Sequence, residues 1–167
     1  AQMVGGGMIG VQFAAFKTQL GPMLNGLITY DVYVPEKTMK FPGAEEFLVT
    51  YRERAKAVGT DPLGLYLIPF AHAEVQVIEQ AIKAVGSLDE GKLAEYMHKA
   101  KFNTIIGDVE FDALGEWKNP RALQVQYQGV VGNDVEQFKQ PGKQVILWPL
   151  NLRSGNLIVP YDTSKNK

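Results

Sequence analysis

The sequence has no cysteine among its 167 residues and only two histidines. The lack of cysteine excludes disulfides, thiol nucleophiles and zinc–thiolate centres. His72 shares one turn of a predicted helix with Glu74, but two such side chains are no metal-binding signature. His98 lies beside Lys99 on the polar side of another predicted helix. We therefore expect neither a metal centre nor a cofactor.

A strong charge of one sign and long apolar runs are also missing. The formal net charge is −1, so no basic surface indicates nucleic acid as a partner. No apolar run approaches the length of a membrane span. No serine has the context of a nucleophile elbow. The acidic pairs Glu45–Glu46 and Asp89–Glu90 stand where predicted helices begin, which the helix dipole explains. A binding module is therefore favoured over an enzyme.

The chain does contain alternating strands and helices, which predicts an α/β fold with a largely parallel sheet. Its composition, 46% hydrophobic and 21% charged, is typical of a soluble globular protein. The expected strands span residues 3–4, 26–34, 104–111, 123–131 and 145–150. The expected helices span residues 13–20, 44–58, 71–86 and 88–100. The strand at 123–131 alternates apolar and polar residues, which predicts one exposed face.

The clearest predicted helix spans residues 71–86. The positions that recur at helical spacing, and that we expect to be buried, are Val75, Ile78, Ile82 and Val85. Tyr66, Phe70 and His72 gather where this helix begins, and aromatic residues at such a place line pockets or pack in the core. Gly86 should end the helix, and a capping box from Ser87 to Glu90 should start the next one.

Gly5, Gly7 and Gly10 match the pattern G-x-G-x-x-G, and Asp31 follows 21 residues after Gly10. This is the written form of a dinucleotide-binding turn, in which the backbone approaches a pyrophosphate at a helix N-terminus. The preceding strand is short, and Asp31 lies inside an apolar run. A tight strand-to-helix turn and a ligand-facing edge of exposed amides are the other interpretations. A dinucleotide-binding fragment of an oxidoreductase is therefore an alternative function.

Six segments resemble a known family in their order and spacing. They are VGGGMIG, NGLITYDVYVP, FLVTYRERAKAVGTDP, AHAEVQVIEQAIKAVGSLD, NTIIGDVEFDALGEWKNP, and QVQYQGVVG with VILWPL. Together they resemble the C-terminal half of type I periplasmic substrate-binding proteins of ABC importers, in the branched-chain amino acid branch. The sequence opens AQMVGGG, without an initiator methionine or a signal peptide. We therefore expect a processed or cut chain that lacks the N-terminal half.

The resemblance implies two α/β lobes joined by hinge strands, with the ligand clamped between them. It assigns residues 1–25 to lobe 2, 26–35 to a hinge strand, 36–125 to lobe 1, 126–160 to the hinge return and the end of lobe 2, and 161–167 to a tail. The implied function is the periplasmic solute-binding subunit of an ABC importer. Its implied partners are a small-molecule ligand, the importer permease, and the missing half or a swapped copy. A ligand-sensing receptor domain is a further alternative.

The family's ligand-facing positions map onto two places in this sequence. The turn after the first strand corresponds to Gly6, Gly7 and Met8, where amino acid binders carry an acid that pairs with the ligand ammonium. The aromatic position before the helix corresponds to His72, with Phe70 close by, and a weaker candidate is Tyr30 on the hinge strand. A buried ammonium without an anionic partner is costly. We therefore expect an aromatic or aliphatic carboxylate rather than a free amino acid as the ligand.

Overall fold

The computed structural model describes residues 1–161, which fall into two units. Unit 1 contains residues 1–40, 52–66 and those from 122 onward, and unit 2 contains residues 41–51 and 67–121. The boundary passes through α2 (Ala44–Val58), which ends at Gly59 with a φ of 69°. Each unit has its own β-sheet. No helix among the described residues is long and apolar enough to cross a membrane.

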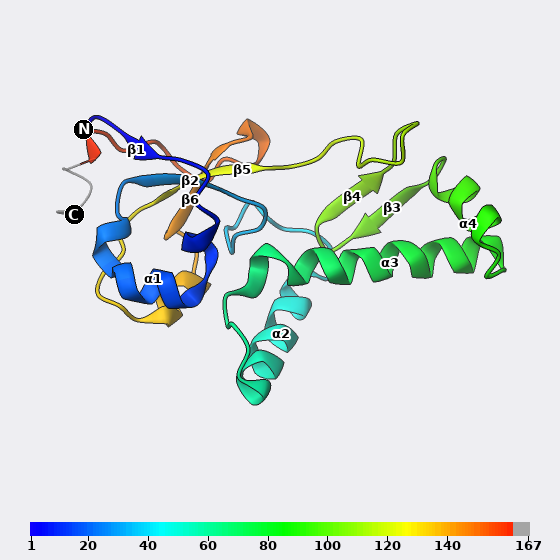
Figure 1. The fold of residues 1–167 in the computed structure, drawn as a ribbon, viewed down its shortest axis with the longest axis horizontal. Helices are drawn as coiled ribbons and strands as arrows, with labels where there is room; N and C mark the ends of the chain where they lie inside the picture. Colours follow the sequence, from blue (N-terminus) through cyan, green and yellow to red (C-terminus); the bar gives the residue numbers. More distant parts are fainter. Residues whose placement is uncertain (162–167) are drawn as a thin grey trace. The chain divides into compact units, whose positions relative to one another are not determined.

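Unit 1 is built on a four-stranded sheet with the order β1-β2-β5-β6 (Figure 1). The strands are β1 (Val4–Gly5), β2 (Leu27–Asp31), β5 (Leu123–Tyr127) and β6 (Gln144–Trp148). Only β1 and β2 are parallel, and the helical segment between them returns the chain to the same end of the sheet. β5 runs antiparallel to β2, and β6 runs antiparallel to β5. The α/β fold is confirmed, and its sheet is mixed rather than largely parallel.

The crossover from β1 to β2 is compact. It consists of the 3₁₀ turn η1 (Ile9–Gln12), α1 (Ala14–Leu20) and the 3₁₀ turn η2 (Gly21–Leu24). Two further 3₁₀ turns flank β6, namely η4 (Val135–Lys139) and η5 (Leu150–Leu152). The unit 1 core combines the crossover with β5 and later loops; its buried members are Val11, Ala14, Leu24, Leu63, Tyr127, Val130 and Phe138.

Unit 2 packs one long helix against a β-hairpin, as Figure 1 shows. The helix is α3 (Ile68–Val85), which follows the 3₁₀ turn η3 (Gly64–Tyr66) of unit 1. The hairpin is formed by β3 (Lys101–Thr104) and β4 (Gly107–Glu110), and α4 (Glu90–Met97) lies between α3 and the hairpin in the sequence. As predicted, Gly86 ends α3 in the left-handed conformation.

The predicted buried stripe of α3 is wrong. Val75 and Ile78 are 62% and 43% exposed. The buried positions share small or compact side chains and are Pro69, Ala73, Val77 and Ala81. Beside this face, the Ile105 backbone N–H donates to Gln76 Oε1 at 2.9 Å. Glutamine amides therefore satisfy backbone groups of the hairpin, and small residues allow close packing. A hydrophobicity pattern does not register either effect.

Two strand predictions also need correction. The strand expected at 104–111 is the second half of the hairpin, because the chain reverses before Gly107, whose φ is 99°. β5 has no exposed face, since Gln124 alone among its residues is exposed. Gln126 is 1% exposed, and its side-chain Nε2 donates to the carbonyls of Gly26 and Ile158 at 3.1 and 2.9 Å. In the sequence, a buried glutamine whose amide is hydrogen-bonded produces the same apolar–polar alternation as a glutamine on the surface.

The predicted capping box of the following helix is also wrong. Asp89, not Ser87, is the N-cap of α4, and its carboxylate accepts a hydrogen bond from the Lys92 N–H at 3.0 Å. The Ser87 hydroxyl instead accepts from the Asp89 N–H at 3.1 Å. Serine therefore supports the turn before the helix, and aspartate, an equally good cap, takes the capping position.

Candidate functional site

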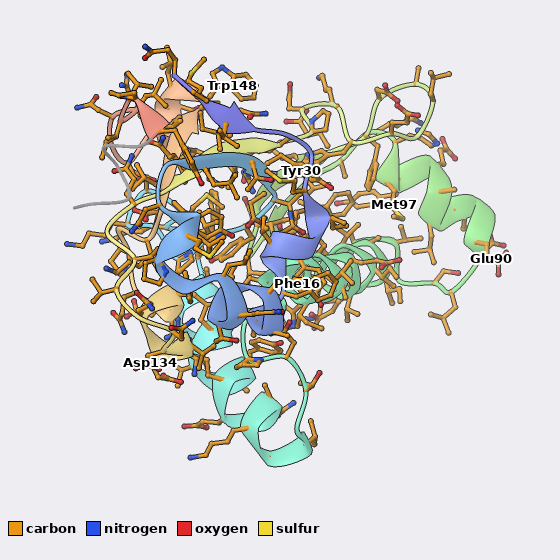
Figure 2. The ribbon with its side chains drawn as sticks, turned by 60° about the vertical axis from the view of Figure 1, so that its left-hand side comes forward. Phe16, Tyr30, Glu90, Met97, Asp134 and Trp148 are labelled. Atoms are coloured by element: carbon orange, nitrogen blue, oxygen red, sulfur yellow. The ribbon has the colours of Figure 1, made fainter. Side chains whose placement is uncertain are left out.

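The glycine turn forms one side of a hollow in unit 1. The hollow has a volume of about 530 Å³, and its lining residues are Met3, Gly5, Gly6, Gly7, Ile28, Tyr30 and Gln124. Three predicted ligand-facing residues, Gly6, Gly7 and Tyr30, therefore meet here, and Figure 2 labels Tyr30 on β2. Met8 does not line the hollow, because its partly buried side chain packs against the unit 1 core. None of the lining side chains carries a charge.

The backbone of the turn leaves one donor available. The Gly6 N–H donates to the Ile28 carbonyl at 3.1 Å, which extends the pairing of β1 with β2. The Met8 N–H donates to the Gly6 carbonyl at 3.0 Å. Within the described residues the Gly7 N–H has no hydrogen-bond partner, and Gly7 is exposed. A backbone N–H in such a position is a suitable donor to a carboxylate.

The three glycines of the turn differ in what they permit. A Cβ at Gly5 would lie 2.6 Å from the Ile28 carbonyl oxygen, so the strand pairing requires glycine there. A Cβ at Gly6 would meet nothing within 4 Å, and one at Gly7 would lie 3.7 Å from the Tyr30 ring, an ordinary contact. Only the first position is therefore closed to other residues on steric grounds.

A buried polar cluster of Lys17, Asp31 and Gln144 lies behind the hollow. Successive residues of β2 point to opposite faces, so that Tyr30 lines the hollow while Asp31 is 2% exposed. Gln144 Nε2 donates to Asp31 Oδ2 at 2.9 Å, and Lys17 Nζ donates to Gln144 Oε1 at 2.8 Å. One glutamine side chain thus links the two buried charges, and it ties α1, β2 and β6 together.

The electrostatics of this cluster follow from its burial. Burial lowers the pKa of Lys17 to about 8, opposed by the negative charges of Asp31 and Asp61. Burial also raises the pKa of Asp31, opposed by Lys17 and by hydrogen bonds from backbone N–H groups and Gln144. Beside the cluster, Gln12 Nε2 donates to the Tyr30 carbonyl at 3.2 Å. The buried side of the sheet therefore fixes the strand that presents Tyr30.

The geometry does not match a dinucleotide-binding turn. The glycines lead into the 3₁₀ turn η1, and α1 begins only at Ala14 and has seven residues. The Ala14 N–H donates to Asp61 Oδ2 at 3.2 Å, so a carboxylate of the chain already occupies that helix end. Asp31 is buried in the polar cluster, where it cannot reach a ribose hydroxyl. The alternative based on Gly5, Gly7 and Gly10 loses its structural basis.

Phe70 and His72 lie in the first turns of α3 and do not share a pocket. Phe70 lines an apolar pocket within unit 2, where its ring lies 6.4 Å from the Trp117 ring. His72 is exposed, and its ring lies 5.0 Å from that of Phe47. Residues two apart on a helix face different directions, which explains the separation. Tyr66 belongs to unit 1 and contacts Phe13, with ring centroids 4.7 Å apart.

Sequence reasoning missed Gln124 and Trp117, which line the hollow and the unit 2 pocket respectively. The alternation of β5 was the available signal for Gln124. Trp117 follows the hairpin without any periodic pattern, so no signal marked it. Among the described residues, no three histidine, aspartate or glutamate side chains are placed to hold a metal ion.

No family model matches the chain, but individual proteins do. The Leu/Ile/Val-binding protein homolog 1 of Brucella suis is 30% identical over 122 residues, which cover 72% of this chain and 30% of that protein. The leucine-, isoleucine-, valine-, threonine- and alanine-binding protein of Pseudomonas aeruginosa is 38% identical over 64 residues, which cover 38% of this chain and 17% of that protein.

The solved structure of the leucine binding protein LivK from Thermotoga maritima has a similar fold. Its TM-score is 0.51 at 25% sequence identity, and the match covers 72% of this chain and 31% of that structure. The chain thus spans less than a third of the length of each protein that it matches. In sequence and in fold, it is a type I periplasmic binding protein-like polypeptide, related to part of the Leu/Ile/Val-binding proteins.

Proposed function

We propose that the chain supplies part of the ligand site of a solute-binding protein, and that the hollow of unit 1 takes the carboxylate of a small solute. The observation that carries this proposal is the N–H of the exposed residue Gly7, which has no partner within the described residues. It lies at the edge of a hollow without a charged lining residue. A carboxylate accepts from such a donor strongly, because a charged acceptor shortens and strengthens the hydrogen bond.

The relatives' names favour an amino acid as the solute. They mention leucine, isoleucine and valine, and in one case also threonine and alanine. These names do not support the aromatic or aliphatic acid expected from a turn without an acidic residue. Ile28 and Met3 suit an aliphatic side chain, and the ammonium would find its partner outside this lining. A simple aliphatic carboxylate is the second candidate, since no acidic side chain lines the hollow.

The same proposal makes the protein an extracytoplasmic, periplasmic subunit of an ABC importer, with the permease as its partner. The relatives, all binding proteins by name, support this role. His72 and Phe70 remain proposed ligand contacts; both belong to unit 2, and neither lines the hollow. The gene's neighbours test the role: permease and ATPase genes indicate import, and signalling genes indicate a receptor.

Amide NMR on the 167-residue chain tests the carboxylate contact. Leucine and 4-methylpentanoate should both shift the Gly7 signal, whereas 4-methylpentan-1-ol, which lacks the carboxylate, should not. Gly7→Pro removes the N–H and should abolish binding of both, while Gly7→Ala retains the N–H and should preserve it. Circular dichroism checks the fold of each variant. An equal Gly7 shift with the alcohol would show that no carboxylate is recognised there.

Gly7→Glu separates the two solute candidates. Because a side chain at this position meets only the Tyr30 ring at 3.7 Å, the turn should accommodate glutamate. The new carboxylate would give a ligand ammonium its missing partner. Titration calorimetry should then show tighter leucine binding and weaker 4-methylpentanoate binding than in the wild type. Loss of affinity for both would contradict the proposed orientation of the solute.

A further inference from the structure

We infer a second small-molecule site that lies wholly within unit 2 and takes a small apolar amine. The site is the pocket beside α3, called here the aromatic pocket, with a volume of about 370 Å³. That volume lies within the range of ordinary ligand pockets. Every residue that lines it belongs to unit 2. The inference does not depend on the proposed function, which rests on the hollow of unit 1.

The floor of the aromatic pocket is apolar and closely packed. Ala73 and Val77 of α3 are 2% and 4% exposed. Opposite them, Ile106 in the hairpin turn and Val109 on β4 are equally well buried. Small side chains on the helix bring the hairpin close and leave a shallow apolar surface. A floor of apolar side chains offers an apolar ligand burial with little desolvation of polar protein groups.

Aromatic rings form its walls. The rings of Phe70 and Trp117 meet edge to face, with centroids 6.4 Å apart and planes at 66°. Phe111 stands against the buried Phe102 at 6.3 Å, which fixes its ring. Met97 of α4, labelled in Figure 2, adds a flexible side. These walls suit a phenyl ring or a short branched alkyl group.

Glu74 is the only charged residue among those that line the aromatic pocket. Its neighbours four positions away on the helix are Phe70 and Ile78, so the helix itself offers it no basic partner at that spacing. In the part of the chain that the structure describes, Glu74 has no ion pair, whereas Glu79 pairs with Lys83 at 2.6 Å. A carboxylate bordering an apolar pocket is complementary to an ammonium whose apolar body lies inside.

Arg121 brings a positive charge near this site, and its guanidinium is already engaged. Its guanidinium carbon lies 4.8 Å from the Phe41 ring centroid and 5.7 Å from that of Trp117. Its Nη2 donates to the Ile106 carbonyl. A ligand cation would be repelled at the Trp117 ring. The ammonium is therefore assigned to Glu74 and the apolar body to the rings and the floor.

Fluorescence of Trp117 tests the inference. The chain has two tryptophans, and Trp148 is 54% exposed, so Trp148→Phe leaves Trp117 as the single reporter. The probes are 2-phenylethylamine, 2-phenylethanol and 3-phenylpropionate, which share the ring and differ in charge. The amine should bind at least about threefold more tightly than the alcohol, which corresponds to a modest ion pair, and the acid should bind most weakly.

Two matched variants locate the charge, and a third locates the pocket. Glu74→Gln should reduce the affinity for the amine to that for the alcohol. Glu79→Gln removes the same charge from the same helix outside the pocket and should change nothing. Met97→Phe, which adds no second tryptophan, should narrow the pocket and weaken binding of all three probes. Methyl NMR should show the amine shifting Val77 and Val109, which keeps the test valid if a variant fails to fold.

Several outcomes would overturn the inference. No response to any probe at millimolar concentration would show that the pocket takes no small molecule. Equal affinities for the amine and the alcohol, or an unchanged affinity in Glu74→Gln, would remove the role of the carboxylate. The probes are titrated at a protein concentration at which sedimentation shows a monomer, because association through the exposed Ile78, which lines the pocket, would cover it. Gly7→Pro should not affect amine binding, so failure here is distinct from failure of the proposed function.

Discussion

The hollow of unit 1 and the aromatic pocket of unit 2 differ in the chemistry of the residues that line them. The hollow of unit 1 has backbone amides, a tyrosine and a glutamine on its surface, and the buried polar cluster behind it. The aromatic pocket of unit 2 has rings on its surface, aliphatic side chains beneath and one carboxylate among its lining residues. What lies behind each surface explains the difference. Polar groups that must point precisely need hydrogen-bonded support, whereas an apolar wall needs only packing.

The comparison also shows where each hollow is vulnerable. In unit 1 the position of Tyr30 depends on individual hydrogen bonds, such as that from Gln12 to its carbonyl. When one partner of a buried hydrogen bond is removed, the other polar group stays buried without a partner. The free-energy cost of that unpaired group exceeds what the hydrogen bond contributed to stability. In unit 2 the pocket walls are held by many apolar contacts, and one apolar side chain can replace another of similar volume at small cost in stability. Substitutions should therefore act sharply in unit 1 and gradually in unit 2.

The largest effect is expected from Gln144→Leu. This change keeps the approximate size of the side chain but leaves the Lys17 ammonium and the Asp31 carboxylate without their common partner. Two hydrogen bonds to charged, buried groups are lost, so the free energy of unfolding should fall by about 3 kcal/mol. Urea denaturation measures it. The exposed Gln124→Leu on the neighbouring strand is the control and should have little effect on stability. Similar losses in both variants would contradict the role of the cluster.

The buried polar cluster also marks the limit of prediction from sequence. Helix α2 was predicted with its exact bounds, and Gly21, Gly59 and Gly86 end helices as expected, because local propensity and glycine geometry decide these features. Lys17 is 3% exposed, yet nothing in its local sequence indicates burial. Its partner Gln144 lies 127 residues away. Long-range polar pairing has no periodicity to reveal it.

The candidate site, like the fold, could be predicted from the sequence only in part. Gly6, Gly7 and Tyr30 came from the resemblance and do meet in one hollow. Met8 was expected beside them but does not line the hollow, because its side chain packs against the unit 1 core. Phe70 and His72 stand close together in the sequence, but the helix directs them to different surroundings. Adjacency in sequence was thus a poor guide to adjacency in space.

The stability of the folded chain should depend on pH between about 8 and 10.5, because the buried Lys17 titrates in the polar cluster of unit 1. The pKa of Lys17 is lowered from 10.5 to about 8, so between these values the unfolded chain binds more protons than the folded one. Stability should therefore rise with pH across this window, by at most about 3 kcal/mol. Chemical denaturation from pH 7.5 to 9.5 measures the slope, and Lys17→Met should remove it. This range stays below the titration of Tyr127, whose pKa burial raises. An identical slope in Lys17→Met would refute the assignment.

The glycine turn allows a smaller, matched test. A Cβ at Gly5 would lie 2.6 Å from the Ile28 carbonyl oxygen, and relief requires β1 to move from β2. Gly5→Ala should therefore lower the free energy of unfolding by about 2 kcal/mol, the usual cost of overpacking. Gly6→Ala meets open space and should be neutral or slightly stabilising. Thermal unfolding of the two variants compares them directly. Equal stability would mean that the edge strand contributes nothing.

The smallest effect on stability, with a clear effect on association, is expected from Val75→Lys. Val75 is 62% exposed on α3, and Ile78, next to it on the helix surface, is 43% exposed. Exposed apolar side chains that adjoin one another promote association between copies. A lysine at this position removes no buried contact, so the free energy of unfolding should change by less than about 0.5 kcal/mol.

Sedimentation velocity should show wild-type chains associating as concentration rises, and Val75→Lys should reduce this association. Lysine in place of Val58, which is 76% exposed at the end of α2, is the control and should leave association unchanged. A wild-type chain that stays monomeric at high concentration would show that exposed apolar residues on α3 do not by themselves make a contact surface.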